Sequence, residues 1–309
     1  MPGRPLLIGT RGSPLALWQA RHVWSRLLEA NGLGEGEAGL SVITTSGDRI
    51  KDKPLREFGG KGLFTKEIDE ALLRGDVDLA VHSMKDLPTE LPDGICIAAV
   101  LPRADMRDAF IGREAPSLGE LPPGAVIGTS SLRRAAQVLR LRPDLRVVDF
   151  RGNVETRLKK LAAGQADATL LALAGLERLG LAAHASSILS TDEMLPAVAQ
   201  GAIGVTCRAD DTRTRQLLEK LNDEASATAI ACERAFLSRL DGSCKTPIAG
   251  LAEIESGMLR FRGLILSPDG REWYAVELKG EARHARQIGA DAVEELLARA
   301  GPEFMASLI

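Results

Sequence analysis

Ile8-Gly-Thr-Arg-Gly-Ser13 and Ile127-Gly-Thr-Ser-Ser-Leu-Arg-Arg134 are two forms of one pattern, and this pattern decides the fold. In each, a short apolar run predicts a buried strand, and Gly-Thr followed by serine leads into a helix. A second matched pair, Gly75-Asp-Val-Asp78 and Gly164-Gln-Ala-Asp167, occurs in the same order and precedes a strand each time. Two repeated motifs that occur in the same order predict two similar α/β lobes.

The first lobe is predicted to begin with a strand, a helix and a second strand. Residues 6–10 form the first strand, and Ser13 and Pro14 start the helix, because serine caps N-termini and proline suits the first helical position. Gly32 ends the helix, and residues 40–45 form the next strand. This βαβ start predicts a parallel sheet. The apolar stripe of the helix omits Trp18 and Gln19 and consists of Leu17, Ala20, Trp24, Leu27 and Leu28.

A third strand, residues 78–83, delivers His82-Ser-Met-Lys-Asp86 to its carboxyl end. In open parallel sheets this end is where ligands bind. Further strands are expected at 95–101, 127–129, 145–150, 168–174 and 203–207, with a helix after Arg151. The charged, glycine-rich stretch 46–62 is too long for an ordinary connection, so it is either a lid or a solvent loop.

The last third changes character. A helix over 224–240 is followed by three strands, 248–254, 259–266 and 273–278, and by a final helix ended by Gly301. Consecutive strands with short turns predict a small antiparallel α+β domain. We therefore expect a first α/β domain of residues 1–101 plus 200–219, a second of 102–199, and a C-terminal α+β domain of 220–309.

Composition limits the classes of function. The 309 residues are 45% hydrophobic with a net charge of −3, which supports real cores and gives no general case for nucleic-acid binding. No stretch approaches the roughly 20 apolar residues of a membrane helix. The N-terminus lacks an apolar signal core, and the four cysteines show no C-x-x-C spacing. We expect a cytoplasmic protein with free thiols and no metal site.

Five arginines are placed where helices begin or just inside them. A helix N-terminus attracts anions, and guanidinium forks match carboxylate or phosphate. Any single arginine could be an ordinary surface charge, but five at such positions predict a cleft for a polyanion. They are Arg11, Arg133, Arg134, Arg151 and Arg157.

Two further residues stand out. Asp86 is the one carboxylate among these cations, so it should stay ionised and could accept a proton or stabilise a developing cation; alternatively it caps a helix before Leu87-Pro88. Cys244 lies in Leu240-Asp-Gly-Ser-Cys-Lys-Thr-Pro-Ile248, where glycine and proline predict a loop. Its thiol is either exposed and functional or a small buried hydrophobe.

At these residues the chain closely resembles the porphobilinogen deaminase family, also called hydroxymethylbilane synthases. The matching motifs occur in family order over nearly the whole chain: residues 8–20, 59–64, 81–86, 128–134, 151–153, 195–202 and 242–247. One departure is that many members carry glycine where Ser243 stands, although serine also occurs there.

The resemblance implies a dipyrromethane cofactor joined by a thioether to Cys244. Four porphobilinogen units would be added in turn with loss of ammonia, and hydrolysis would release hydroxymethylbilane. It also implies two doubly wound lobes like those of periplasmic binding proteins, a third domain with a three-stranded antiparallel sheet, and a monomer.

The family's functional residues transfer by motif. Asp86 would contact pyrrole N–H groups and stabilise the positive charge of the reaction. The cofactor's acetate and propionate groups would be held by Ser83, Lys85, Thr129, Ser131, Arg133 and Arg134. Substrate or the growing chain would be held by Arg11, Ser13, Gln19, Arg151 and Arg157, with Lys61 in the lid.

Two other classes compete with an enzyme. A non-catalytic two-lobed anion-binding protein would need no thiol in a third domain. A ligand-sensing domain of a transcription regulator would be expected beside a helix-turn-helix, which the sequence does not show.

Overall fold

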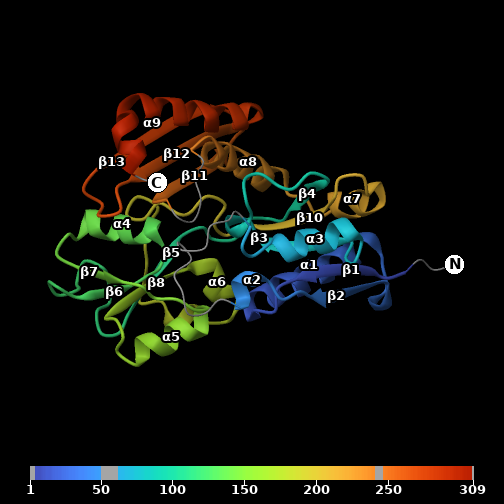
Figure 1. The fold of residues 1–309 in the computed structure, drawn as a ribbon, viewed down its shortest axis with the longest axis horizontal. Helices are drawn as coiled ribbons and strands as arrows, with labels where there is room; N and C mark the ends of the chain where they lie inside the picture. Colours follow the sequence, from blue (N-terminus) through green and yellow to red (C-terminus); the bar gives the residue numbers. More distant parts are fainter. Residues whose placement is uncertain (1–3, 50–61, 241–245, 308–309) are drawn as a thin grey trace. The chain divides into compact units, whose positions relative to one another are not determined.

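The computed structural model describes residues 4–49, 62–240 and 246–307 (Figure 1). The chain divides into two compact units, Met1–Ala104 with Ala202–Ala227, and Asp105–Gly201 with Thr228–Ile309. The first unit is called the first lobe below. Within the second unit, residues 105–201 are the second lobe and residues 228–307 the C-terminal domain. The three-domain boundaries predicted from the sequence stay a prediction.

The first lobe is built on a sheet of order β2-β1-β3-β10-β4. Strands β1 (Leu6–Thr10), β2 (Ala38–Val42) and β3 (Leu79–Ser83) run parallel, as predicted. Strand β10 (Ile203–Arg208) runs antiparallel to β3 and to β4 (Ile95–Val100). The parallel arrangement predicted from the βαβ start therefore holds for β1, β2 and β3 but does not extend to β10. This strand enters after the whole second lobe instead of through a crossover helix, so the βαβ rule does not set its direction.

Helix α1 (Pro14–Asn31) is capped as the sequence predicts. The Ser13 side chain accepts from the Ala16 N–H at 3.3 Å, and Gly32 closes the helix with φ of 63°. The buried face differs from the predicted stripe, because Gln19 and Val23 are buried whereas Leu17 and Trp24 are only half-buried. The remaining helices of the lobe are α2 (Ser46–Arg49), α3 (Lys66–Arg74), α7 (Thr212–Glu219) and the 3-10 turns η1 (Glu35–Glu37) and η3 (Met84–Asp86).

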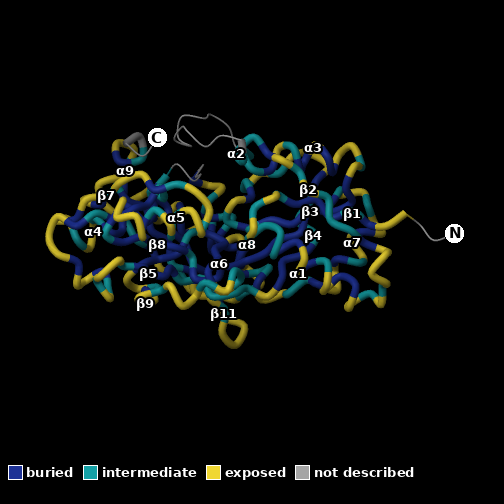
Figure 2. Tube along the Cα trace, turned by 90° about the horizontal axis from the view of Figure 1, so that it is seen from below, coloured by how far each residue is buried: buried dark blue, intermediate teal, exposed yellow. Residues whose placement is uncertain are grey.

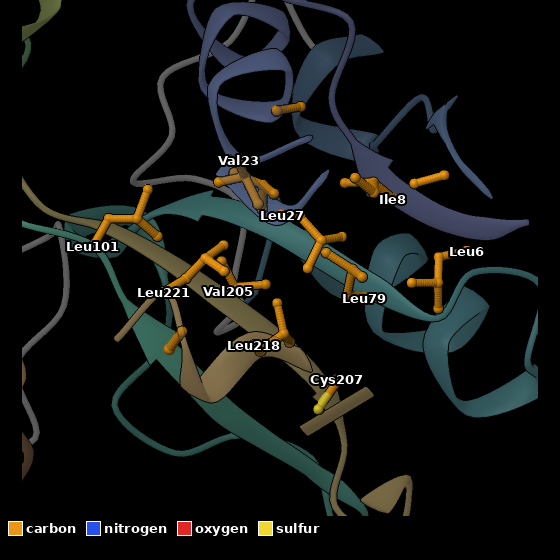
Figure 3. Packing of buried hydrophobic residues seen from close by; sticks show 14 of the residues in the cluster. Leu6, Ile8, Val23, Leu27, Leu79, Leu101, Val205, Cys207, Leu218 and Leu221 are labelled. Carbon is orange, nitrogen blue, oxygen red and sulfur yellow. The ribbon is translucent and has the colours of Figure 1, made fainter. Parts of the chain in front are cut away.

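Side chains from the sheet and its covering helices form the core of the first lobe. Figure 3 shows Val23 and Leu27 of α1 close to Leu79 of β3, with Leu218 of α7 near Val205. The central strands β3 and β10 are buried along nearly their whole length, and the tube of β3 is dark blue in Figure 2. Because the strands are buried, their polar carboxyl ends are held in fixed positions.

The second lobe repeats this topology, with a sheet of order β7-β6-β8-β5-β9. Strands β6 (Val126–Gly128), β7 (Arg146–Val148) and β8 (Ala168–Ala172) run parallel, and β5 (Asp108–Gly112) runs antiparallel to β8 and to β9 (Ser187–Ile188). Its helices are α4 (Leu132–Leu141), α5 (Val154–Ala162), α6 (Leu173–Arg178) and the 3-10 turn η4 (Ala182–His184). The prediction of two similar doubly wound α/β lobes is confirmed.

The repeated Gly-x-x-Asp motif makes the same strand-to-strand hydrogen bond in both lobes. The Asp78 carboxylate accepts from the Leu7 N–H at 2.9 Å, and Asp167 accepts from the Val126 N–H at 2.8 Å. Each aspartate therefore ties the start of one parallel strand to its neighbour. Gly75 and Gly164 precede them with φ of 76° and 73°, a conformation that glycine adopts without steric cost.

The C-terminal domain is the predicted antiparallel sheet with helices. Helix α8 (Glu224–Arg239) leads to strands β11 (Ile248–Glu255), β12 (Met258–Leu266) and β13 (Trp273–Glu281), in the order β11-β12-β13. After the turn η5 (Ala282–His284), α9 (Ala285–Ser307) is interrupted at Gly301, whose φ of 73° ends the first helical segment. Among the described residues, no helix is both long and apolar enough to cross a membrane.

Candidate functional site

The carboxyl end of β3 presents Ser83, Lys85 and Asp86. Met84 fixes this turn, because its N–H donates to the Ala202 carbonyl at 3.0 Å and its side chain is 1% exposed. The side chain lies against Gly204 of β10, where an added Cβ would fall 2.0 Å from the Met84 sulfur. With Met84 held inside, Lys85 is half-buried and the Asp86 carboxylate is exposed. The turn can therefore offer one cation and one anion to a ligand.

Gln19 and Ser83 are brought together from different elements. The Gln19 side-chain amide donates to the Ser83 hydroxyl at 2.9 Å, and Gln19 is 2% exposed. A buried amide needs such a partner, since leaving it unpaired would cost about 1–3 kcal/mol. The pair joins α1 to the end of β3, so one residue predicted for substrate positions one predicted for the cofactor.

His82, next to Ser83, is a buried neutral base. Its Nε2 lies 3.0 Å from the Thr206 hydroxyl. Burial, together with the positive charge of Arg11, lowers the pKa of His82 to about 4. The imidazole is therefore neutral near pH 7 and serves as a hydrogen-bond partner inside the sheet.

Arg11 and Ser13 follow β1, and both have partners within the first lobe. Arg11 Nε donates to Asp48 at 3.2 Å, and its guanidinium lies over the Phe64 ring, 4.2 Å from the centroid. Burial raises the pKa of Asp48, but hydrogen bonds from Arg11 and Thr45 outweigh it and the pKa is lowered. Ser13 is the helix cap described above. Arg11 is thus held by α2, at the start of the stretch predicted to be a lid.

The matching position in the second lobe carries Thr129 and Ser131. Ser131 caps α4, and its own N–H donates to the Thr129 hydroxyl oxygen at 3.2 Å. Thr129 is buried and Ser131 is half-buried. The predicted cofactor hydroxyls of this lobe therefore lie together at the N-terminus of a ten-residue helix.

Arg133 and Arg134, one turn further along, are both buried against Asp108. Each guanidinium donates one Nη2 hydrogen bond of 2.7 Å to this carboxylate, and each Nη1 donates to a main-chain carbonyl, Leu195 for Arg133 and Leu170 for Arg134. Burial raises the pKa of Asp108, but the two arginine charges outweigh it and hold the pKa far below its usual range.

The arginines retain limited capacity for a ligand. Within residues 4–49, 62–240 and 246–307, the buried Nε atoms of Arg133 and Arg134 have no hydrogen-bond partner. Buried N–H groups are normally paired. These two donors, together with the hydroxyls of Thr129 and Ser131, suit a carboxylate-bearing group, so the residues present fit a dipyrromethane with acidic side chains.

Arg151 and Arg157 follow β7 at the same lobe. Arg151 lies in the turn before α5, which Asn153 caps by accepting from the Thr156 N–H at 2.8 Å. Arg157, one turn inside α5, donates from Nε to the Gly152 carbonyl at 2.8 Å. Both arginines are half-buried. Lys61 and Cys244 lie outside the described residues.

The sequence interpretation missed Asp108 and Asp48, which accept hydrogen bonds from the predicted arginines. It also missed Gln200, which donates to Asp108. Asp108 is 0% exposed and begins an otherwise apolar strand. A charge at the head of such a strand, in a chain with two adjacent arginines, was the available signal. Gln200 lies inside the matched motif 195–202 but was given no role.

Comparisons with known proteins agree over nearly the whole chain. Residues 6–216 match the family model "Porphobilinogen deaminase, dipyromethane cofactor binding domain", and residues 227–298 match "Porphobilinogen deaminase, C-terminal domain". A porphobilinogen deaminase of Paracoccus denitrificans is 56% identical over 303 residues, covering 98% of this chain and 97% of that protein. A chloroplastic porphobilinogen deaminase of Oryza sativa subsp. japonica is 55% identical over 306 residues, covering 97% and 86%. Among solved structures, a periplasmic substrate-binding protein from Coxiella burnetii is similar with a TM-score of 0.45 and 16% identity, covering 74% of this chain and 96% of that one.

Proposed function

This chain belongs to the porphobilinogen deaminase family, and from that premise we propose that it adds four porphobilinogen units in turn to a dipyrromethane primer joined to Cys244. Each addition releases ammonia, and hydrolysis then frees hydroxymethylbilane and leaves the primer on the protein. The chain is a transferase of tetrapyrrole synthesis and carries the family's dipyrromethane cofactor binding domain. A non-catalytic two-lobed binder is not favoured.

The observation that carries the mechanism is the turn after β3. Asp86 is exposed there on a backbone fixed by buried Met84, so its carboxylate can meet a ligand without rearranging the turn. It accepts pyrrole N–H groups and stabilises the positive charge that develops as ammonia leaves and as the new bond forms. A preorganised charge aimed at a transition state is often the largest catalytic contribution.

The other residues bind carboxylates. When bound, dipyrromethane supplies the pyrrole position at which the chain is extended. The residues proposed to bind its acidic side chains are Ser83, Lys85, Thr129, Ser131, Arg133 and Arg134.

Cations suit the substrate for the same reason, since each porphobilinogen brings two carboxylates. The proposed substrate residues are Arg11, Ser13, Gln19, Arg151 and Arg157, with Lys61 in the lid. Arg11 already donates from Nε and Nη2 to Asp48. It therefore binds a substrate carboxylate through its remaining N–H groups. Ser13 and Gln19 act mainly by holding α1 and Ser83 in place.

Intact mass measurement of the full-length protein tests this function. Protein from a host that makes porphobilinogen should exceed its sequence mass by one dipyrromethane, and digestion should place the addition on the peptide containing Cys244. The variant Cys244→Ser should have its unmodified mass and no turnover. The control thiol variant Cys96→Ser should keep the added mass and the turnover of the wild type. A wild-type protein that is active without the added mass would falsify the proposed tether.

A further inference from the structure

Asp108, Arg133 and Arg134 form a buried cluster with unequal charges. The side chains of the two arginines are each 6% exposed and that of Asp108 is 0% exposed. Two guanidiniums and one carboxylate leave one net positive charge in this cluster. Buried charge is costly unless it is paired. The cluster therefore lacks one negative charge within itself.

The unpaired donors point to the same deficit. The Nε atoms of both arginines are buried without a hydrogen-bond partner in the part of the chain that the structure describes. One carboxylate oxygen accepts such donors readily, and a carboxylate would also neutralise the excess charge. The charge and the donors thus independently call for an anionic ligand.

Asp108 decides which donors remain for that ligand. It takes Nη2 from each arginine, one on each of its two oxygens. Because the Nη1 groups are held by main-chain carbonyls, both guanidiniums are fixed. Each Nη group already donates one hydrogen bond, whereas the Nε–H groups donate none among the described residues. Without Asp108, two adjacent buried cations would repel each other and lose this orientation.

Gln200 braces the carboxylate from the segment that precedes β10. Its amide donates to Asp108 and to the Met106 carbonyl, both at 2.8 Å. The residue before it, Ala199, has φ of 62°, and its N–H is accepted by the buried Glu233 carboxylate of α8. Glu233 also accepts from the Ala252 N–H of β11 at 2.8 Å. Hydrogen bonds therefore connect Glu233 of α8, through the main chain at Ala199 and the Gln200 side chain, to Asp108.

We propose that Asp108 is a positioning residue for cofactor binding: it holds Arg133 and Arg134 so that their Nε–H groups face one carboxylate of the dipyrromethane, with Gln200 as its support. This inference rests on the proposed function. Asp108 contacts no substrate and exchanges no proton; it acts through the arginines.

The test follows loading of the full-length protein made without porphobilinogen. Wild type, Asp108→Asn and the control Asp167→Asn are mixed with porphobilinogen, and the loaded fraction is followed by intact mass. Asp167 is a partly buried carboxylate of the same lobe that contacts Val126 and Arg113 but not the two arginines. We expect Asp108→Asn to load at least 10-fold more slowly and Asp167→Asn to load within 2-fold of wild type.

Thermal unfolding separates positioning from general stability. Loading should raise the unfolding midpoint of the wild type, since a group bound only by the native state stabilises it. In Asp108→Asn the rise in midpoint on loading should be smaller than in the wild type. In Asp167→Asn the rise should equal that of the wild type, even if its unloaded and loaded midpoints are both lower. A merely structural Asp108 would lower the unloaded and loaded midpoints equally.

Gln200→Ala keeps the test decisive if Asp108→Asn does not fold. It removes only the brace, so loading should slow 2- to 5-fold. Loading at the wild-type rate with an unchanged rise in midpoint, in Asp108→Asn or, failing that, in Gln200→Ala, would overturn the proposal. A wild-type protein that does not load at all would instead refute the proposed function and leave the variants without a reference.

Discussion

In the first lobe β3 ends in Ser83-Met-Lys-Asp86, whereas the equivalent strand β8 of the second lobe ends in Ala172-Leu-Ala-Gly175. The antiparallel neighbours differ in the opposite sense: Ile203 of β10 pairs with Ser83, and Asp108 of β5 pairs with Ala172. The first lobe thus carries its charge on an exposed turn, and the second buries its charge beside a helix. One backbone plan thus presents different chemical groups at equivalent positions in its two copies, and the proposed function assigns catalysis to the first copy and ligand binding to the second.

Removing the exposed Asp86 carboxylate of the first lobe should have the largest effect. Asp86→Asn keeps the shape of the side chain but removes its charge, so turnover should fall by at least about 100-fold, the scale of losing one preorganised electrostatic contact. Loading with dipyrromethane should persist, because the carboxylate-binding groups are unchanged. Steady-state turnover and intact mass measure the two effects.

Asp93→Asn is the control for this variant, since Asp93 is also exposed, belongs to the first lobe and lies outside the turn η3 (Met84–Asp86). It should match the wild type in both assays. Normal turnover of Asp86→Asn would remove Asp86 from the mechanism and with it the division of roles between the lobes.

Asp78 and Asp167, which each tie the start of one parallel strand to its neighbour, should contribute unequally to stability because their surroundings differ. The Asp78 side chain is 8% exposed and pairs with Arg4 and Arg208, whereas that of Asp167 is 38% exposed and pairs with Arg113 at 3.5 Å. Removing charge from a largely buried carboxylate that has two arginine partners costs more than removing it from an exposed pair, which contributes about 1 kcal/mol or less. Asp78→Asn should therefore destabilise its lobe more than Asp167→Asn destabilises the other.

Hydrogen exchange in increasing urea, read on peptides from each lobe, measures the two effects separately. The wild-type protein is the reference, and each variant should leave the opposite lobe nearly unchanged. If the two variants lost equal amounts of stability in their own lobes, the burial of Asp78 would not account for its contribution.

His82 should make the first lobe sensitive to acid, and the second lobe has Leu171 at the equivalent position. The pKa of His82 is about 4, against 6.5 for an exposed histidine. Between these values the unfolded chain binds a proton that the folded chain does not, so this contribution is complete above pH 6.5 and is lost as the pH falls toward 4. His82→Leu should remove about 2 kcal/mol of the stability difference between pH 7 and pH 4.5.

Urea unfolding of the first lobe at the two pH values tests this. Burial raises the pKa of Asp69 to about 6, which acts in the opposite direction, but Asp69 is present in both proteins and cancels in the comparison. His184→Gln, at an exposed site, should leave the pH dependence unchanged. The same acid sensitivity in His82→Leu and wild type would show that another group titrates.

Local signals in the sequence predicted the repeated backbone well. Ser13, Ser131, Gly75 and Gly164 act on residues within one or two turns, so their effects can be read from neighbours along the chain. The predicted ends of the strands were less accurate, because a strand ends where its pairing with the neighbouring strand ends. Strand β2 ends at Val42, which pairs with Thr10 of β1, and not at the predicted Thr45.

The buried polar contacts could not be predicted in this way. Gln19 meets Ser83 across 64 positions, and Asp108 meets Gln200 across 92. Periodicity placed Gln19 off the apolar stripe because it assigns polar side chains to solvent unless a distant partner is known. The roles of the site residues remain predictions, carried by the family motifs.

The smallest predicted effect is the loss of stability when the glycine of the repeated Gly-x-x-Asp motif is replaced, and it tests whether Gly75 and Gly164 are equivalent. Gly75 and Gly164 have nearly the same φ, so alanine at either position should cost about 1 kcal/mol, the usual penalty for a left-handed residue with a Cβ. The space differs: a Cβ at Gly75 would lie 4.0 Å from Arg208, and at Gly164 it would lie 2.9 Å from the end of Arg113. Because Arg113 is flexible and 42% exposed, it can move, and the two costs should agree within about 0.5 kcal/mol. Thermal unfolding of Gly75→Ala and Gly164→Ala measures this, with Gly36→Ala as the control in open space without a positive φ. A much larger cost at Gly164 would mean that the Arg113 side chain is fixed, so that the turn at Gly164 is more rigid than the turn at Gly75.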